Sequence, residues 1–214
     1  MLSLEGNIGA GKSTLLSKLE KTKFSKDHIV MYEPVDEWLN VRPDGPNSMS
    51  LFQKYYSDKR RHGFLFQMYA LQTRLTHLLQ VIENNPDKII ICERTHLTDA
   101  EIFAKMLAQD NIMDASEYFV YKEWYNHCNK LLNGALKGVI YLRTSVPVCM
   151  TRIAKRNRGG EDNISVGYIN TLHKLHDEWL LNHNNLQICV VDGDVDEEQV
   201  DIHQVTQFIN SLAI

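Results

Sequence analysis

A glycine-rich segment near the start of the chain has the residue types that hold phosphate groups. It matches the pattern GxxxxGK[ST] and consists of Gly6, Asn7, Ile8, Gly9, Ala10, Gly11, Lys12 and Ser13, followed by Thr14. Glycines let backbone N–H groups turn toward phosphate oxygens, Lys12 can reach the β- and γ-phosphates, and the Ser13 hydroxyl can ligate Mg²⁺. A linking turn alone would not explain Lys12 and Ser13 at this spacing. The segment therefore predicts binding of a nucleoside triphosphate.

Two carboxylates follow apolar segments that have the character of buried strands. Glu33 follows residues 28–32, and Glu93 follows residues 88–92. A phosphoryl transferase needs a metal anchor and often a group that accepts the proton of the attacking hydroxyl. Charged residues commonly flank strands, but Glu93 is followed by Arg94, which adds a cation where a transferred phosphate carries negative charge. Which carboxylate is the base and which holds the metal stays open.

A predicted long helix at residues 63–83 presents polar groups suited to a planar base. Gln67, Ala70 and Arg74 are spaced i, i+3 and i+7 and so share one face. The Gln67 amide offers a donor and acceptors, Ala70 leaves space, and Arg74 can donate to a ring nitrogen or a carbonyl. The alternative is an exposed polar stripe on an amphipathic helix, which these residues alone do not exclude.

Further along the chain, Asp99 and Phe103 stand four residues apart on the next predicted helix, and Phe103 and Phe66 have the ring type that stacks on a base.

A basic cluster precedes two glycines in the second half of the chain. It contains Arg152, Lys155, Arg156 and Arg158, just before residues 159–160. In a chain of net charge −4, this density indicates an anion, and a lid closing over a triphosphate would neutralise the γ-phosphate and exclude water. The alternative is a solvated basic end of a helix, which the helix dipole favours.

The elements that must position these side chains alternate between strand and helix. Strands are expected at residues 1–4, 28–32, 88–92, 137–142 and 186–191. Helices are expected directly after the glycine-rich segment, with Leu15, Leu16 and Leu19 on one face, and at 63–83, 98–109, 114–132, 147–156, around 168–180 and at 200–212. This order predicts an open parallel α/β sheet of about five strands with helices on both faces, and ligands at the carboxyl ends of the strands. No linker divides the 214 residues, so residues 1–214 are expected to form a single domain.

Composition excludes several other classes of protein. The chain has 23 Lys and Arg against 27 Asp and Glu, which argues against a nucleic-acid coat and against a polybasic membrane binder. No apolar stretch is long enough to span a bilayer. The four cysteines (Cys92, Cys128, Cys149 and Cys189) form no CxxC pair and are expected to be reduced, buried thiols. With no targeting segment evident, we expect a cytoplasmic protein, a processed organellar form being the alternative.

The motif-bearing segments resemble, in one order, those of deoxynucleoside kinases of the deoxycytidine kinase and deoxyguanosine kinase type. They are EGNIGAGKST at residues 5–14, EPVDEW at 33–38, FQMYA at 66–70, ERT at 93–95 and RxxxRxRxxE at 152–161. The glycine-rich segment alone occurs in many families, whereas the other segments together are much more specific. The resemblance extends from residue 2 to about residue 197.

This resemblance implies a P-loop kinase fold with the P-loop at residues 6–13 and an arginine-rich lid at about 152–162. The implied reaction transfers the γ-phosphoryl group of ATP to the 5′-hydroxyl of a deoxynucleoside. The implied catalytic residues are Lys12, Glu33, Glu93 and Arg94, with Ser13 and Glu93 at Mg²⁺. Beyond the P-loop, Arg152, Arg156 and Asp196 are implied to contact ATP. This chain has Glu197 where relatives often carry an aromatic residue.

The same resemblance implies an acceptor pocket. Its residues would be Glu33, Trp38, Tyr56, Phe66, Gln67, Ala70, Arg74, Arg94, Asp99, Phe103, Arg158 and Glu161. Tyr56 and Glu161 match the pair that hydrogen-bonds the sugar 3′-hydroxyl, with Tyr55 as the alternative to Tyr56. Arg74 and Asp99 match an Arg–Asp pair of members that accept deoxycytidine and deoxypurine nucleosides, where thymidine-preferring relatives carry Met and Ala. We therefore expect deoxycytidine and deoxypurine nucleosides to be preferred over thymidine.

The family also implies partners and a role. Its members are homodimers, are inhibited by end-product deoxynucleoside triphosphates, and supply DNA precursors by nucleotide salvage. Two other readings remain at this stage, a nucleoside monophosphate kinase of the thymidylate kinase type and a catalytically silent subunit with a kinase fold. A silent subunit would not need to keep Lys12, Glu33 and Arg94, all of which are present.

Overall fold

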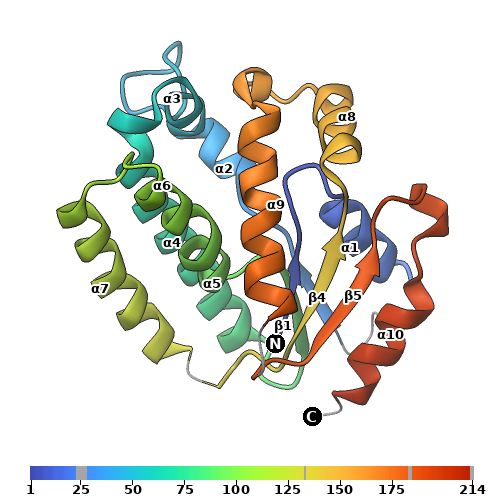
Figure 1. Ribbon diagram of the computed structural model, residues 1–214. Helices are drawn as coiled ribbons and strands as arrows, with labels where there is room; N and C mark the ends of the chain where they lie inside the picture. Colours follow the sequence, from blue (N-terminus) through green and yellow to red (C-terminus); the bar gives the residue numbers. More distant parts are fainter. Residues whose placement is uncertain (23–27, 133, 183–184, 213–214) are drawn as a thin grey trace.

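The computed structural model describes residues 1–22, 28–132, 134–182 and 185–212 (Figure 1). In this part of the chain five strands form one parallel sheet in the order β2-β3-β1-β4-β5. The strands are β1 (Leu2–Glu5), β2 (His28–Met31), β3 (Ile89–Glu93), β4 (Gly138–Arg143) and β5 (Ile188–Asp192). The predicted α/β class and parallel sheet are therefore confirmed, with strand ends that differ by up to two residues from the expected ones.

Helices cover both faces of the sheet (Figure 1). On one side α1 (Lys12–Glu20) packs against α10 (Ile202–Ser211). On the other side lie the long helices α4 (Lys59–Asn84), α7 (Ala115–Leu131) and α9 (Val166–Leu181). Right-handed crossovers between parallel strands require this division. A strand in the middle of the sheet is buried on both sides and can be a continuous apolar run, as Ile90, Ile91 and Cys92 of β3 show.

Short helices surround the carboxyl edge of the sheet. They are α2 (Val35–Asn40), α3 (Leu51–Ser57), α5 (His96–Thr98), α6 (Lys105–Gln109) and α8 (Val146–Arg156), with 3₁₀ turns η3 (Glu161–Asn163) and η4 (Glu197–Gln199). The sequence did not predict α2 and α3, because each is too short to show a helical period. Ser50 caps α3 and Gln53 completes a capping box, which fixes the start of the helix. Helix α4 begins at Lys59, before the expected residue 63, because Asp58 caps it.

The helix expected at 98–109 is not a regular α-helix. A π-helical segment, η2 (Asp99–Ala104), separates α5 from α6. Such wide turns occur mostly as local bulges, frequently at functional sites, and they rotate the side chains that follow. Asp99 and Phe103 both lie in this segment, so the distortion falls where two of the predicted acceptor residues stand.

The four cysteines are all free and buried, as the sequence predicted. No helix in the described part of the chain is both long and apolar enough to cross a membrane.

Candidate active site

The P-loop wraps around its own lysine between β1 and α1. Gly9 has a φ of 77° and Gly11, which precedes α1, a φ of 101°, both in the left-handed region that favours glycine. A Cβ atom at Gly9 would lie 2.5 Å from the carbonyl oxygen of Cys149, so only glycine fits. The buried Lys12 ammonium donates to the Asn7 carbonyl oxygen at 2.9 Å.

Lys12 forms an ion pair with Glu93, the last residue of β3. Its Nζ lies 3.7 Å from Glu93 Oε1, and Ser13 Oγ donates to Glu93 Oε2 at 2.9 Å. Burial, together with the positive charge of Arg94, lowers the pKa of Lys12 to about 8, and Glu93 opposes this shift. A triphosphate in the loop would add the negative charge that restores the ammonium. The buried ammonium of Lys12 is therefore suited to bind an anionic ligand.

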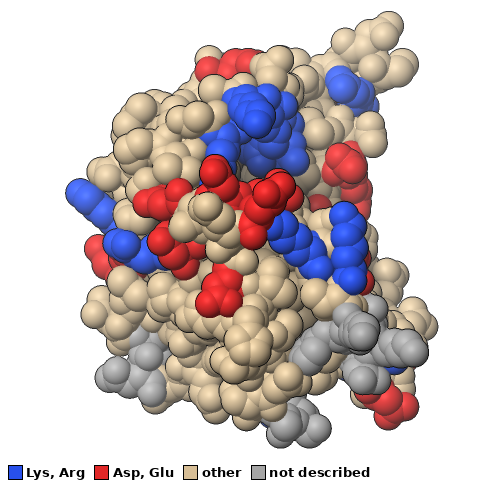
Figure 2. Space-filling view, turned by 90° about the vertical axis from the view of Figure 1, so that its right-hand side faces the viewer, with Lys and Arg blue, Asp and Glu red and all other residues tan. Residues whose placement is uncertain are grey.

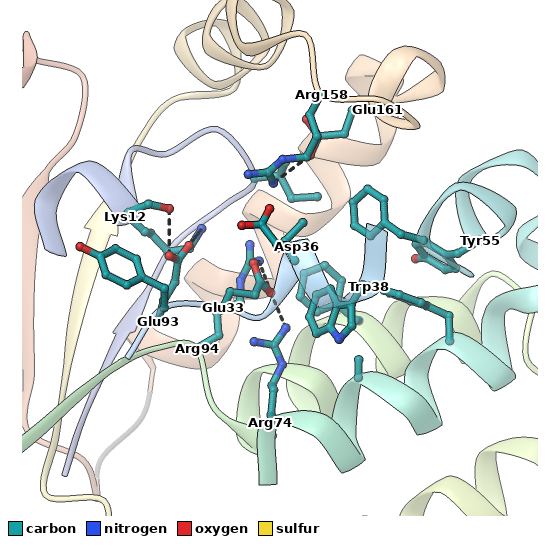
Figure 3. Close-up of a pocket in the computed structure, with 18 of the residues that line it drawn as sticks. Lys12, Glu33, Asp36, Trp38, Tyr55, Arg74, Glu93, Arg94, Arg158 and Glu161 are labelled. Carbon is teal, nitrogen blue, oxygen red and sulfur yellow. Dashed lines mark hydrogen bonds and ion pairs between the residues drawn. The ribbon is translucent and has the colours of Figure 1, made fainter. Parts of the chain in front are cut away.

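Glu33 lies between two buried arginines (Figure 3). Arg94 Nη1 donates to both carboxylate oxygens at 2.9 and 2.8 Å, and Arg74 Nη2 donates to Oε1. Burial alone would raise the pKa of Glu33, but the charges of Arg94 and Arg74 outweigh it and hold the pKa well below its ordinary value. Glu33 is therefore an ionised hydrogen-bond acceptor at neutral pH.

The backbone at Arg94 is unusual in a way that serves this contact. Its φ is 62°, a left-handed conformation that costs energy for a residue with a side chain. The guanidinium also donates to the Gly6 carbonyl oxygen at 3.2 Å and lies 5.0 Å from the centroid of the Phe103 ring. Arg94 thus links the P-loop to the carboxylate at the end of β2.

Glu5, at the end of β1, anchors the turn that carries Arg94 and Asp99. Its Oε1 accepts a hydrogen bond from Thr98 Oγ1 at 2.7 Å and another from Ser3 Oγ. Burial raises the pKa of this carboxyl to about 7, although both hydroxyl donors oppose the shift. Glu5 was not predicted to be a site residue, because a carboxylate before a glycine-rich turn has no distinctive sequence signal.

All the predicted acceptor residues line one cavity of about 250 Å³ (Figure 3). Gln67, Ala70 and Arg74 project from α4, and Asp99 and Phe103 from η2. The cavity also includes Tyr55, the predicted alternative to Tyr56, and four residues that were not predicted to line it, namely Tyr32, Val35, Asp36 and Phe52. Val35 and Asp36 lie inside the EPVDEW segment. Their closeness to Glu33 in the sequence could have indicated that they line the same cavity.

The deep end of this cavity carries polar groups with unused hydrogen-bonding capacity. Arg74 Nε donates to Asp99 Oδ1 at 3.1 Å, and Trp38 Nε1 donates to Thr73 Oγ1 at 3.0 Å. Gln67 Oε1 and Arg74 Nη1 are buried without a hydrogen-bond partner. Burial raises the pKa of Asp99 to about 6, and the charge of Arg74 opposes the rise. Unpaired buried polar atoms indicate a polar ligand.

The side of the cavity under α3 is aromatic. Tyr55 stacks on Phe66 with ring centroids 4.7 Å apart, and its hydroxyl lies 3.2 Å from that of Tyr168. Tyr56 packs on Phe52, with centroids 5.0 Å apart. Both tyrosines line the cavity.

Glu161 holds two arginines of the predicted lid. Arg156 Nη2 donates to both Glu161 oxygens at 2.7 Å, and Arg158 Nη1 lies 3.6 Å from Oε1. Glu161 is buried, whereas the side chain of Arg156 is 33% exposed. One carboxylate thus engages both arginines.

A second cavity of about 630 Å³ opens on the other side of the P-loop. Of the predicted ATP contacts, Gly9 to Thr14, Arg152, Arg156 and Asp196 line it. Ile8 lines the acceptor cavity, and Gly6 and Asn7 line neither. The Asn7 side chain instead braces the loop, because its Nδ2 donates to the Ile169 carbonyl oxygen at 2.9 Å. Lys155 of the predicted basic cluster also lines this cavity, as do Glu197, which stands where relatives often carry an aromatic residue, and Lys18, which was not predicted.

Arg152 differs in its surroundings from the other lid arginines. Its guanidinium donates to the carbonyl oxygens of Ala10, Gly193 and Val195 at 2.9 to 3.0 Å. These bonds tie α8 to the P-loop and to the loop after β5. Arg152 thus joins two walls of the second cavity.

Charge is segregated on the face that carries α8 and the loop after β5 (Figure 2). Basic side chains gather at the level of α8, directly above a band of acidic ones. Lys155 and Arg156 are exposed in the last turn of α8, and Asp194, Asp196 and Glu197 are exposed in the loop.

The two cavities meet at the P-loop. Six residues line both of them: Gly9, Lys12, Ser13, Glu93, Arg156 and Arg158. A molecule in the larger cavity can therefore present a phosphate to a molecule in the smaller one. The geometry suits a phosphoryl transfer between two ligands held end to end.

Comparison with known proteins identifies the family. Residues 2–213 match the family described as deoxynucleoside kinase. The chain belongs to the deoxynucleoside kinase family. A probable deoxycytidine kinase of fowlpox virus (strain NVSL) is 32% identical over 199 residues, covering 91% of this chain and 79% of that protein. The deoxycytidine kinase of Mus musculus is 30% identical, covering 99% of this chain and 91% of that protein.

A mitochondrial deoxyguanosine kinase of Xenopus laevis is also 30% identical to this deoxynucleoside kinase, covering 84% of this chain and 72% of that protein. The family resemblance seen in the sequence is thereby confirmed, and the chain is a deoxynucleoside kinase.

Proposed function

We propose that this kinase transfers the γ-phosphoryl group of ATP to the 5′-hydroxyl of a deoxynucleoside in nucleotide salvage, with residues 1–214 as one kinase domain. The observation that carries the proposal is the shared wall of the two cavities. Lys12 and Glu93 stand where they join, and Glu33 with Arg94 lies just inside the smaller one. ATP would occupy the larger cavity and the nucleoside the smaller one.

Glu33 would orient the 5′-hydroxyl and accept its proton. A carboxylate with a lowered pKa is a weak base, so the proton would move late, when the 5′-oxygen is already bonding to phosphorus. Arg94 would then hold both the carboxylate and the charge of the transferred group. This assigns Glu33 as the base and leaves Glu93 near the metal.

Ser13 and Glu93 fit the chemistry of a magnesium site. Both provide hard oxygen donors, and Ser13 Oγ lies 2.9 Å from Glu93 Oε2. Mg²⁺ usually binds through one or two protein groups together with phosphate oxygens and water. A bound Mg²⁺ would neutralise charge on the phosphates.

Glu161 and Arg156 would change partners when ATP binds. The γ-phosphate would draw the partly exposed Arg156 away from Glu161, and the freed carboxylate could accept from the sugar 3′-hydroxyl. Tyr56 or Tyr55 would complete that contact. Arg158 lines both cavities and would follow the same phosphate.

Replacing Arg156 with Ala should lower kcat by about a hundredfold, because a cation at the transferred phosphate is lost. The unfolding temperature should change little, since the side chain is partly exposed. Steady-state kinetics and thermal unfolding check this, with Arg60→Ala at an exposed position of α4 as the control. Near-normal turnover of the Arg156 variant would indicate that the basic cluster is only a solvated end of a helix.

We further propose that deoxycytidine and deoxypurine nucleosides are preferred over thymidine. Asp99, fixed by Arg74, can accept from an exocyclic amino group of cytosine or adenine. Thymine would present a carbonyl to the same carboxylate and leave it unpaired, which costs binding energy.

We also propose a homodimer and inhibition by deoxynucleoside triphosphates. Phe119, Trp124 and Leu131 on α7 and Leu65 on α4 are large apolar side chains that are more than half exposed. Since α4 packs against α7, they can form a surface that a second copy would cover. A deoxynucleoside triphosphate could place its nucleoside in the smaller cavity and its phosphates on the P-loop.

An assay of ADP release tests the proposed function. We expect turnover with ATP and deoxycytidine, and at least a hundredfold lower kcat/KM with deoxycytidine 5′-monophosphate. Turnover with monophosphates alone would instead indicate a nucleoside monophosphate kinase. No turnover with any acceptor would indicate a silent subunit.

A further inference from the structure

The wall of the acceptor cavity carries as many anionic as cationic side chains. Five are cationic and five are anionic: Lys12, Arg74, Arg94, Arg156 and Arg158 against Glu33, Asp36, Glu93, Asp99 and Glu161. With all of them ionised, the wall is electrically neutral. Removing any one carboxylate would leave a net positive cavity, which attracts an anion such as a phosphorylated acceptor.

Nine of these ten residues are ion-paired. Lys12 pairs with Glu93, Glu33 with Arg94 and Arg74, Arg74 also with Asp99, and both lid arginines with Glu161. Asp36 is the exception. Among the described residues of this wall, it is the one charged side chain for which the structure shows neither an ion pair nor a hydrogen bond. The nine paired residues carry five positive and four negative charges, so the unpaired carboxylate of Asp36 is the one that brings the wall to neutrality.

The position of Asp36 places this charge at the phosphate end of the cavity. It stands in the first turn of α2, three residues after Glu33, and its side chain is exposed. Figure 3 shows its carboxylate pointing into the cavity, in the space between Glu33 and the lid residues Arg158 and Glu161. The base-reading groups lie at the opposite, deep end on α4 and η2. A nucleoside with its base at that end would direct its 5′ position toward Asp36.

We propose that Asp36 is a specificity-determining residue that makes the cavity select neutral nucleosides and reject their 5′-monophosphates. This inference rests on the proposed function of the cavity. A nucleoside is uncharged, so the carboxylate costs its binding little. A monophosphate carries close to two negative charges at neutral pH and would be repelled. The same repulsion would help release the monophosphate product and prevent a second phosphorylation.

The test compares binding of deoxycytidine and of deoxycytidine 5′-monophosphate by equilibrium titration without ATP. In Asp36→Asn, the ratio of the monophosphate Kd to the nucleoside Kd should fall about tenfold. Asp36→Glu keeps the charge and should keep the ratio within about threefold of the unmodified protein.

The matched control is Glu37→Gln, which removes a carboxylate from the next position of the same helix. Glu37 accepts from the Tyr69 hydroxyl at 2.8 Å, pairs with His77, and does not line the cavity. In Glu37→Gln, the ratio of the monophosphate Kd to the nucleoside Kd should stay unchanged.

An unchanged ratio in Asp36→Asn would overturn the proposal, and so would an equal fall in the Glu37→Gln control. If Asp36→Asn fails to fold, raising the ionic strength for the unmodified protein replaces it, because salt should screen the repulsion and lower the ratio. A ratio insensitive to salt would count against Asp36. Absence of any deoxycytidine binding would instead refute the proposed function.

Discussion

Replacing Glu33 with Gln is expected to lower kcat by about a thousandfold, a size typical of losing a positioned proton acceptor. The amide can still accept from Arg94 and Arg74, so the cleft keeps its shape, but it cannot take the proton of the 5′-hydroxyl. Nucleoside affinity should change far less than kcat. Steady-state kinetics at saturating ATP and nucleoside measure this effect.

Glu93→Gln is the paired variant that separates the two carboxylates. If Glu93 and Ser13 hold Mg²⁺, this variant should lose activity at low Mg²⁺ and recover part of it as the concentration rises. Glu33→Gln should show no such recovery. If activity recovered with Mg²⁺ only in Glu33→Gln, Glu33 would be the metal ligand and Glu93 the base.

The second large effect concerns the choice of nucleoside. The double replacement Arg74→Met with Asp99→Ala should raise the kcat/KM of thymidine relative to that of deoxycytidine by about a hundredfold, a size set by buried polar groups that would otherwise be unpaired. Both residues must change together. Removing Arg74 alone would leave Asp99 buried without its partner and Glu33 with one cation fewer.

A surface Arg–Asp pair provides the control for this experiment. Arg143 donates to both oxygens of Asp177 at 2.9 and 2.8 Å, and neither residue lines the acceptor cavity. Arg143→Met with Asp177→Ala removes the same charges and should leave the ratio unaltered. If thymidine is already the better substrate of the unmodified enzyme, the assignment of Arg74 and Asp99 to recognition of the nucleobase is refuted.

Local patterns in the sequence were enough to place the main groups of the site. The P-loop spacing predicts where Lys12 stands, because the turn and the helix after it are set by neighbouring residues. Glu33 follows the half-buried edge strand β2, Glu93 ends the buried strand β3, and parallel strands bring their ends to one edge of the sheet. Their approach to Lys12 follows from that topology.

Other features depend on contacts between distant segments and left no local signal. The π-helical turn at Asp99 interrupts a helix whose composition looks regular. Arg152 has the spacing of a phosphate-binding lid residue, yet it donates to the Ala10 carbonyl oxygen, 142 residues earlier in the chain. Asp36 looks like an ordinary exposed acid, and only the ion pairs of its neighbours make its unpaired charge noticeable.

The site of phosphoryl transfer tests the central claim most directly. The kinase would be incubated with deoxycytidine and ATP labelled in its γ-phosphate, and the labelled product identified by mass spectrometry and phosphorus NMR. The account predicts the label in the 5′-phosphate of deoxycytidine monophosphate. Label on the 3′-oxygen, or only in free inorganic phosphate, would contradict the placement of the 5′-hydroxyl between Glu33 and the P-loop.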